Sequence, residues 1–545
     1  MFVAWKLVST LIITVLCGQG LSDDPPSAGS SGRIGGSRLY VNEGRTRNIA
    51  IIGSGAAGSS AAYHLRKFAK QENMDINITI FERNGYVGGR ALSVRAYDHD
   101  RAPVIELGAS HFSMDLPILG NATKRLGLKT RKPHGIKHAS TGVWDGQRFL
   151  FTESASSWKK VWNMGKAFVK YGRTPMRIQS LIGQIMRKFR ELYLYPSFPF
   201  KEFRGFTIDL GLHQPATYDA KTVLYLNQIK DDSPFVNDVL QAMTRAAFGK
   251  NLANTQGLQA MSAIDPSLSS QIEGGNWRLI NGMIREANAK TYLNTAVNSV
   301  TRVNYSSFAI STINKHAPAD QMRRTYDNFD NVILAAPFQK EEIQVGDGEL
   351  YRNPWETTYT TLHITVFTSG YRISPKFFGL KPGAKIPTSI ATTMPKGPAS
   401  AANAPDYYFS IETLEAVTNP RTLEQEYIYK IVSPEKITSR FLSELLGKNV
   451  PADLTTIRNT RGETITWYYA KVWDQAYPTD SAFHSQQPIE PGYRIYYTGG
   501  MDSFLSTMEA NALMGMNVAR LIMDEWVEYF TTRPRSAGGH MSGLW

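Results

Sequence analysis

Short, continuously apolar runs alternate with amphipathic stretches over much of the chain. Residues 48–53 (Asn-Ile-Ala-Ile-Ile-Gly) and 76–81 lack a polar alternation, which is typical of parallel strands covered on both faces. Residues 56–70, between them, have helical spacing, and residues 330–336 form another buried run closed by Pro337. This order predicts an α/β fold with a parallel sheet.

The first predicted strand leads into Gly53-Ser54-Gly55-Ala56-Ala57-Gly58. In such a turn Gly53 allows the tight bend, Gly55 lets the backbone approach a pyrophosphate, and Gly58 lets the helix pack on the strand. The phosphates would then lie at the positive end of the helix, against the backbone of Gly55, Ala56 and Ala57. The segment therefore predicts a Rossmann-like dinucleotide site.

Glu82 ends the second predicted strand, twenty-four residues after Gly58. A carboxylate at this position can accept hydrogen bonds from both hydroxyls of an adenosine ribose, and it would repel the 2′-phosphate of NADP. A glycine-rich turn in an unrelated α/β domain is the alternative. The succession of strand, glycines, helix, strand and acid favours the nucleotide site.

Residues 82–90 (Glu-Arg-Asn-Gly-Tyr-Val-Gly-Gly-Arg) resemble the second signature of flavoproteins in the amine oxidase and GDI superfamily. The resemblance implies FAD, with Arg83, Gly89 and Arg90 along the dinucleotide; an arginine fork suits phosphate oxygens. Without it, the two glycines predict only a turn. Residues 106–110 continue the pattern, which implies that Gly108, Ala109 and Ser110 pass close to the flavin.

Residues 112–271 change to helices with intervening hairpins, one of them turning at 144–147. Residues 158–190 carry nine Lys or Arg and no acid, interleaved with apolar side chains. This segment predicts either a peripheral contact with anionic membrane or a solvated helical face over an apolar core stripe.

The chain then returns to the nucleotide domain at Glu273-Gly274-Gly275-Asn276, followed by a helix and a strand over 292–300. In the superfamily the backbone of such a strand meets the adenine, which implies this role for Val297. Residues 496–502 predict a further strand running into glycines, with a helix after Ser506.

The start of this last helix has two interpretations. Its N–H groups and dipole can stabilise the negative charge of a reduced flavin, and the resemblance implies Gly500, Asp502, Met508 and Glu509 as cofactor contacts. Alternatively, Ser506 and Glu509 form only a capping box. Both can hold together. The turn reads Thr-Gly-Gly-Met-Asp rather than the family's usual Asn-Gly-hydrophobic-Glu, so the contact of Asp502 with the ribityl chain is in doubt.

Composition narrows the class of protein. The chain has 545 residues, of which 42% are hydrophobic and 20% are charged, and this composition excludes a disordered or fibrous protein. The sequence contains no run of eighteen uncharged apolar residues, so no transmembrane helix is expected. The net charge of +13 favours acidic surfaces over sequence-specific nucleic-acid binding. The single cysteine, Cys17, leaves a processed protein without disulfides, thiolate metal sites or a cysteine nucleophile, and no metal is expected.

The first residues predict entry into the secretory pathway. A lysine, a short apolar stretch and small residues over 1–21 are typical of a signal peptide, and the Pro/Gly/Ser-rich residues 22–47 predict a flexible linker. Asn121 and Asn304 stand in glycosylation sequons; Asn77 does too, inside a predicted strand. A lysosomal, vacuolar or extracellular destination follows.

Taken together, the glycine motifs, residues 271–276, Ala476-Tyr477-Pro478 and residues 496–512 resemble the prenylcysteine oxidase (prenylcysteine lyase) family over about residues 48–530. The resemblance implies FAD-dependent oxidation of a farnesyl- or geranylgeranyl-cysteine. A hydride passes from the carbon beside sulfur to flavin N5, water adds, and cysteine and a prenyl aldehyde separate. Oxygen then reoxidises the flavin and yields hydrogen peroxide.

The predicted architecture is an FAD-binding domain that is split in sequence, with an inserted α+β substrate domain. The FAD-binding parts are residues 48–115, 271–345 and 481–530; the substrate parts are 116–270 and 346–480; residues 531–545 form a tail.

The sequence contains no hydrolase elbow and no zincin motif, so the flavin would carry the chemistry. His111, Trp473 and Tyr477 could orient the substrate or wall the flavin, although structural roles explain them nearly as well. Two rival functions stay open. One is a flavin amine oxidase, whose usual lysine and aromatic cage cannot be placed from spacing; the other is a GDI-like escort protein that binds prenyl groups without catalysis.

Overall fold

The structure is a computed structural model of the chain. It describes residues 45–530 except 133–139, 155–168, 266, 306, 338–339, 395–403, 405 and 480–485. The predicted signal peptide, the linker up to residue 44, the tail and the basic residues 158–168 lie outside the described residues.

A five-stranded parallel sheet has the order β20-β13-β1-β2-β9. Its bounds are Arg47–Ile52 for β1, Ile76–Phe81 for β2, Lys290–Tyr292 for β9, Asn331–Leu334 for β13 and Ile495–Tyr497 for β20. Ile49 and Ile51 face one layer of the core, and Ala50 and Ile52 face another. Both faces of β1 are therefore buried, which explains its continuous apolar sequence.

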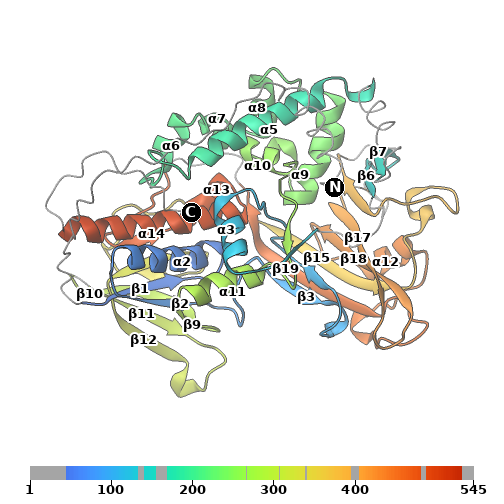
Figure 1. The fold of residues 1–545 in the computed structure, drawn as a ribbon. Helices are drawn as coiled ribbons and strands as arrows, with labels where there is room; N and C mark the ends of the chain where they lie inside the picture. Colours follow the sequence, from blue (N-terminus) through green and yellow to red (C-terminus); the bar gives the residue numbers. More distant parts are fainter. Residues whose placement is uncertain are drawn as a thin grey trace, which may run out of the picture.

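Helices cover one face of this sheet and a second sheet covers the other (Figure 1). The helices are α2 (Ala56–Gln71), α11 (Trp277–Glu286) and α14 (Met508–Phe530), and α2 packs against both of the others. The second sheet has the order β12-β11-β10-β14, with bounds Arg323–Phe329, Ser307–Ile313, Ala296–Asn304 and Gln344–Val345.

The prediction of a single strand over 292–300 is wrong. The chain leaves the parallel sheet after Tyr292 and enters the second sheet at Ala296, and Asn294 between them has φ 53°. The backbone N–H of Thr295 donates to the carbonyl of Glu82, which anchors the turn at the end of β2. Asparagine tolerates the left-handed conformation that this turn requires.

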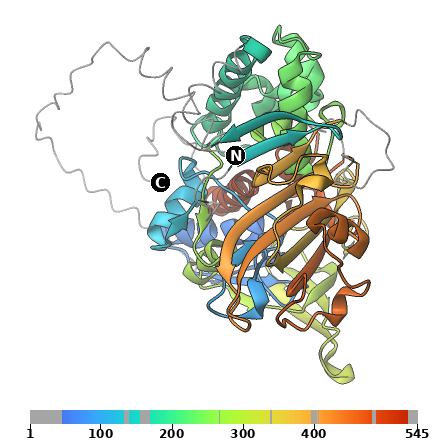
Figure 2. The ribbon, with the colours of Figure 1, turned by 90° about the vertical axis from the view of Figure 1, so that its right-hand side faces the viewer.

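A seven-stranded sheet forms the other large layer, in the order β19-β15-β18-β17-β16-β6-β7. Its bounds are Ser140–Trp144 for β6, Phe149–Ser154 for β7, Tyr359–Ser369 for β15, Ser389–Thr392 for β16, Ser410–Thr418 for β17, Gln425–Ser433 for β18 and Trp467–Pro478 for β19. The hairpin β6–β7 turns at the expected residues and joins the sheet through β16 (Figure 2). Segments from both predicted substrate parts thus share one sheet.

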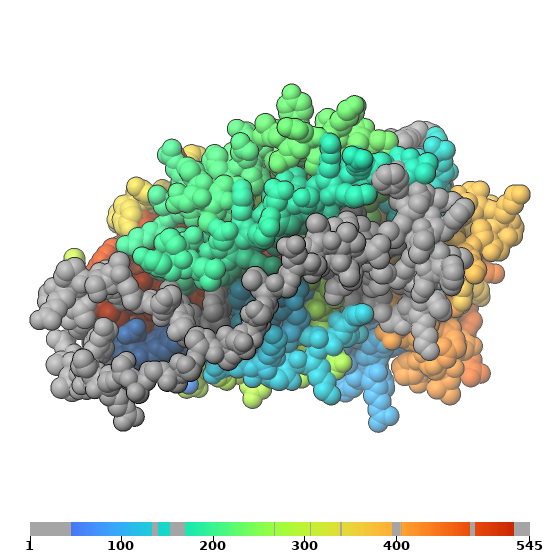
Figure 3. Space-filling model, turned by 45° about the horizontal axis from the view of Figure 1, so that its top comes forward, coloured from blue at the N-terminus to red at the C-terminus, as the bar shows by residue number. Residues whose placement is uncertain are grey.

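A layer of helices lies above α14, reaches the seven-stranded sheet where α9 (Gln241–Phe248) packs against β16, and covers much of one face of the molecule (Figures 1 and 3). The helices of this layer are α5 (Thr174–Glu191), α6 (Phe203–Asp209), α7 (His213–Thr217), α8 (Ala220–Leu226), α9 and α10 (Gly257–Ser262). The apolar stripe of α5 is buried, whereas Arg177, Arg187 and Arg190 are exposed. Within the described part of the chain, no helix is long and apolar enough to cross a membrane.

The capping box expected at Ser506 and Glu509 is also wrong. The helix α14 begins at Met508, and the Thr507 hydroxyl accepts the N–H of Ala510. The Glu509 carboxylate instead accepts the N–H groups of Ile118 and Leu119, both at 2.9 Å, at the start of α3 (Pro117–Arg125). A carboxylate is favoured at a helix N-terminus, but the Glu509 carboxylate caps α3, which lies about 390 residues away in the sequence, and not its own helix.

Candidate active site

A cavity of about 500 Å³ runs from the carboxyl ends of the parallel strands to the seven-stranded sheet. The nucleotide half of the cavity contains the glycine turns that follow β1 and β2. The substrate half lies between the sheet strands β15–β18 and the helices α9 and α10. A crevice at this edge of a parallel sheet is where open α/β folds bind nucleotides.

The three glycines of the first turn have the separate tasks that their spacing predicts. Gly53 has φ +106°, and its N–H donates to the Phe81 carbonyl at 2.9 Å. A Cβ on Gly58 would overlap the Gly53 carbonyl oxygen, whereas no atom lies within 4 Å of a Cβ placed on Gly55. The backbone at Gly55, Ala56 and Ala57 lines the cavity at the start of α2, which is a cradle for phosphates.

Glu82 is buried at the end of β2, and its carboxylate is held from both sides. One oxygen accepts the N–H and hydroxyl of Ser54, at 3.0 and 2.7 Å, and the other accepts the N–H and side-chain amide of Asn84, at 2.8 and 2.7 Å. The two side-chain donors can rotate away, so ribose hydroxyls could replace them. Arg83 also lines the cavity and pairs with Glu341 at 2.5 Å.

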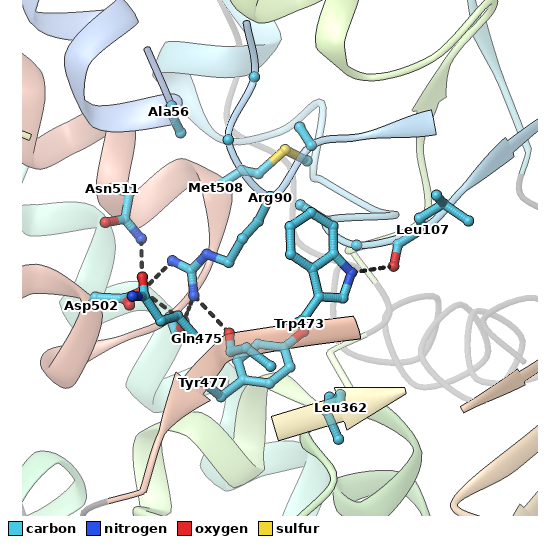
Figure 4. A pocket seen from close by; sticks show the side chains of 18 of the residues that line it. Ala56, Arg90, Leu107, Leu362, Trp473, Gln475, Tyr477, Asp502, Met508 and Asn511 are labelled. Carbon is cyan, nitrogen blue, oxygen red and sulfur yellow. Dashed lines mark hydrogen bonds and ion pairs between the residues drawn. The ribbon is translucent and has the colours of Figure 1, made fainter. Parts of the chain in front are cut away.

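The second glycine turn lies against the first, since a Cβ on Gly89 would come 3.3 Å from Gly55 Cα. Arg90 donates to Asp502 at 2.7 Å and to the Ala476 carbonyl at 2.7 Å (Figure 4). The hydroxyl of Ser506 and the amide of Asn511 also donate to Asp502, at 2.7 and 3.3 Å. Arg90 therefore links the nucleotide half to the substrate half, a role that the motif alone did not predict.

The segment 106–111 passes between the two halves, and Gly108, Ala109, Ser110 and His111 all line the cavity. Asn276 holds this segment: its N–H donates to the Glu106 carboxylate at 2.7 Å and its amide donates to the Ala109 carbonyl at 2.8 Å. Burial raises the pKa of Glu106 to about 7, against the hydrogen bond from Asn276. The Glu-Gly-Gly-Asn motif thus acts by fixing this loop.

Trp473 and Tyr477, on β19, form one wall of the cavity (Figure 4). The indole N–H of Trp473 donates to the Leu107 carbonyl at 2.9 Å, and the Tyr477 ring meets Phe248 edge-on at 5.0 Å. These contacts position both aromatic rings. The catalytic roles considered for His111, Trp473 and Tyr477 stay predictions.

Three predicted contact residues do not line the cavity, and their contact with the cofactor stays a prediction. Gly58 packs helix on strand, and Gly500 begins the short helix α13 (Gly500–Phe504), where a Cβ would press on Phe203. Glu509 is buried away from the cavity, where burial raises its pKa to about 7. Val297, Asp502 and Met508 do line the cavity.

Sequence reasoning missed two charged residues in the substrate half. Lys430 on β18 and Glu412 on β17 are directly opposed across the strand pair, and both line the cavity. Lys430 is 9% exposed and donates to the Glu106 carbonyl at 2.8 Å and the Ser110 hydroxyl at 3.4 Å. Burial lowers its pKa, against the charges of Glu412 and Glu106. A lysine inside the apolar run Tyr-Ile-Tyr-Lys-Ile-Val was the available signal.

The residues present fit an FAD molecule. Glu82 suits the ribose, the open backbone at Gly55 suits the pyrophosphate, and the 108–110 loop lies next to the substrate half. Within the described part of the chain, no group of three or more His, Cys, Asp or Glu could hold a metal ion.

Solved structures of flavin oxidases share this fold. The chain superposes on putrescine oxidase with a TM-score of 0.53 at 17% identity, covering 88% of this chain and 99% of that one. It superposes on a fatty acid isomerase from P. acnes with a TM-score of 0.51 at 15% identity, covering 89% and 98%. The fold and the site together define an FAD-dependent oxidoreductase.

Sequence comparison gives the family. The model of the prenylcysteine lyase family matches residues 152–532, and that of the NAD(P)-binding Rossmann-like domain matches residues 51–121. The chain is 25% identical to farnesylcysteine lyase of Arabidopsis thaliana, covering 89% of this chain and 90% of the relative. It is 24% identical to prenylcysteine oxidase 1 of Rattus norvegicus, covering 88% and 89%. The protein belongs to the prenylcysteine lyase family, as its motifs predicted.

Proposed function

We propose that the protein oxidises the thioether of a prenylated cysteine, with FAD as cofactor and oxygen as electron acceptor, to release cysteine and a prenyl aldehyde. One observation carries the proposal: the nucleotide half and an apolar substrate half belong to a single cavity. The names of the two relatives, farnesylcysteine lyase and prenylcysteine oxidase 1, support this substrate class.

The substrate half suits a hydrocarbon chain. Apolar side chains of the helices face apolar side chains of the sheet across it, namely Met243, Ala246, Ala247, Phe248, Leu268, Leu362, Ile364 and Val432. Burying a prenyl chain there gains about 0.8 kcal/mol for each CH₂ group removed from water.

Bound FAD supplies a hydride acceptor that oxygen can reoxidise. The chain positions the substrate against it. Gly108 has no side chain, and a Cβ there would overlap the Arg90 carbonyl, so glycine lets this loop pack against the second glycine turn. Trp473, held on Leu107, closes the side of the cavity next to this loop. No acid or base of the chain is required for hydride loss itself.

The proposal is tested by mixing the purified holoprotein with farnesylcysteine without oxygen and following the flavin absorbance near roughly 450 nm. We expect bleaching, and farnesal together with hydrogen peroxide once air is admitted. S-decylcysteine is the control, because it has no allylic carbon and should leave the flavin oxidised. A yellow protein bleached by putrescine instead would replace this function by an amine oxidase, and a colourless protein would favour the escort hypothesis.

We further propose that the protein enters the secretory pathway and works in the lysosome, the vacuole or the extracellular space. The signal-like residues 1–21 support this, as does the exposure of both Asn121 and Asn304. Expression in a eukaryotic host should give a glycosidase-sensitive mass that the double variant Asn121→Gln/Asn304→Gln loses. An unglycosylated, cytosolic product would contradict the proposal.

We also propose peripheral contact with anionic membrane through the basic segment 158–190. Arg177 and Arg187 are exposed on α5, and Arg177 donates to the Gln228 carbonyl just after α8, where Tyr225 and Leu226 are exposed. Cations beside exposed apolar side chains are typical of an interfacial surface. Binding to phosphatidylserine vesicles should fall at least threefold in Arg177→Gln/Arg187→Gln, and equal binding to neutral vesicles would contradict the proposal.

A further inference from the structure

The substrate half is apolar except where charged side chains enter it, and one pair of these differs from the rest. Lys471 and Asp474 lie on β19; Lys471 stacks on the Trp473 ring at 4.6 Å, and Asp474 is exposed. Lys430 and Glu412 face the cavity from the middle of the sheet. Lys430 is buried and Glu412 is half-buried, and a charge that is partly removed from water without an ionic partner is costly, so the pair calls for an explanation.

Neither side chain has its hydrogen-bonding capacity filled. The Glu412 carboxylate accepts no hydrogen bond and forms no ion pair among the residues that the structure describes. Lys430 uses two of its three N–H groups, on the Glu106 carbonyl and the Ser110 hydroxyl. The two charges are also not paired with each other within 4 Å. An anionic group and a cationic group therefore remain available side by side.

Their spacing matches a zwitterion. Residues directly opposed on antiparallel strands have Cβ atoms about 5 Å apart, and in an α-amino acid one carbon carries both the ammonium and the carboxylate. Ser389 and Ser410, which line the cavity on β16 and β17, add hydroxyl groups beside the pair. Most other side chains of this half are apolar, so the chamber combines one charged site with a largely hydrocarbon lining.

We propose that Lys430 and Glu412 bind the amino-acid head of the substrate, with Lys430 on the α-carboxylate and Glu412 on the α-ammonium. This inference rests on the proposed function and names the residues that recognise the amino-acid head of its substrate. An internal residue of a peptide presents neither charge.

The arrangement also places the reacting bond. Lys430 is held on the loop 106–110, which lies between the two halves of the cavity. The sulfur of a cysteine is two bonds from the α-carbon, so a head bound at Lys430 and Glu412 brings the thioether next to this loop. The prenyl chain then extends between Phe248 and Leu362, away from the charges.

The test compares three substrates: farnesylcysteine, its methyl ester, which lacks the carboxylate charge, and N-acetylfarnesylcysteine, which lacks the ammonium. For the wild type we expect kcat/KM at least tenfold higher with the free amino acid than with either analogue. Lys430→Met should lose at least tenfold with farnesylcysteine, mainly in KM, and little with the methyl ester. Glu412→Gln should lose as much with farnesylcysteine and little with the N-acetyl analogue.

Glu415→Gln on the same strand and Lys436→Met are matched controls, because neither residue lines the cavity. Flavin content and melting temperature of each variant exclude a folding defect, and Lys430→Arg provides a conservative rescue if Lys430→Met does not fold. Equal losses with free and blocked substrates would overturn the inference, since they would indicate a structural or catalytic effect instead of recognition of the head.

Binding of S-decylcysteine, measured by calorimetry, separates this inference from the proposed reaction. If the wild type binds it and both variants bind at least tenfold more weakly, while farnesylcysteine is not oxidised, the head site stands and the proposed reaction fails. If farnesylcysteine is oxidised but binding and kcat/KM do not depend on Lys430 and Glu412, the reaction stands and the head site fails.

Discussion

The two halves of the cavity are built in different ways. In the nucleotide half the backbone makes the surface: the turns at Gly53–Gly58 and Gly88–Gly89 lie against each other within a short stretch of sequence. In the substrate half, side chains from α9, α10 and five neighbouring strands make the surface, and these residues are spread over more than two hundred positions. Substitutions in the glycine turns are therefore expected to disrupt the fold, whereas substitutions in the substrate half can change the shape of the cavity and leave the fold intact.

The largest effect is expected in the nucleotide half, from Gly58→Ala. The new methyl group would overlap the Gly53 carbonyl, so helix α2 could not pack on β1, and we expect no soluble yellow protein. Gly55→Ala is the matched control, because its methyl group meets no atom within 4 Å and the protein should fold. Expression yield and flavin absorbance check this, and a wild-type yield of Gly58→Ala holoprotein would disprove the packing argument.

Asp502→Ala tests the contact between the halves. It leaves the Arg90 guanidinium without its carboxylate and removes the acceptor of Ser506 and Asn511, so we expect a loss of about 3 kcal/mol in the free energy of unfolding. Denaturant titration measures this. Arg440→Ala is the control, since its pair with Glu444 is exposed and should contribute less than about 1 kcal/mol. Similar losses in both variants would contradict a special role for Asp502.

His64, on α2, makes the stability of the folded protein depend on pH. Burial lowers the pKa of His64 to about 3 in the folded protein, below its ordinary value of 6.5. The folded protein therefore favours the neutral imidazole, and its stability is full above pH 6.5. As the pH falls from 6.5 towards 3, protonation of His64 in the unfolded chain lowers the free energy of unfolding, by about 2 kcal/mol at pH 5.

The variant His64→Phe, which cannot titrate, should lack this loss. Denaturant titrations of both proteins at pH 8 and pH 5 measure the difference. Comparing the two proteins also removes the opposite effect of Glu106 and Glu509, whose raised pKa values favour the folded state at the lower pH. Parallel pH profiles of the two proteins would show that His64 does not titrate as argued.

The smallest effect is expected in the substrate half, from Ala246→Phe. The larger side chain narrows the apolar chamber without touching the glycine turns, so the protein should keep its flavin. We expect kcat/KM for geranylgeranylcysteine to fall about tenfold more than that for farnesylcysteine, which corresponds to about 1.4 kcal/mol. Equal losses for both substrates would mean that Ala246 does not limit chain length.

The errors of sequence reasoning concern side-chain partners more than elements. Glu509 fitted a capping box at α14 by spacing, yet its carboxylate caps α3, because packing places that helix start within hydrogen-bond reach. Asp502 followed the family's pattern imperfectly, and the structure shows it as the partner of Arg90. Local spacing cannot distinguish between such partners, since both arrangements satisfy the same pattern.

The sequence by itself determined the parallel sheet, the glycine turns, Glu82 and the family, because these depend on hydrophobic runs and on residues adjacent along the chain. Only the tertiary structure decided that Lys430 and Glu412 lie side by side in the cavity, that Asn276 holds the loop of Gly108, and that Arg90 joins the two halves. These contacts come from strand register and from the packing of distant segments, and nothing in the local sequence encodes either directly.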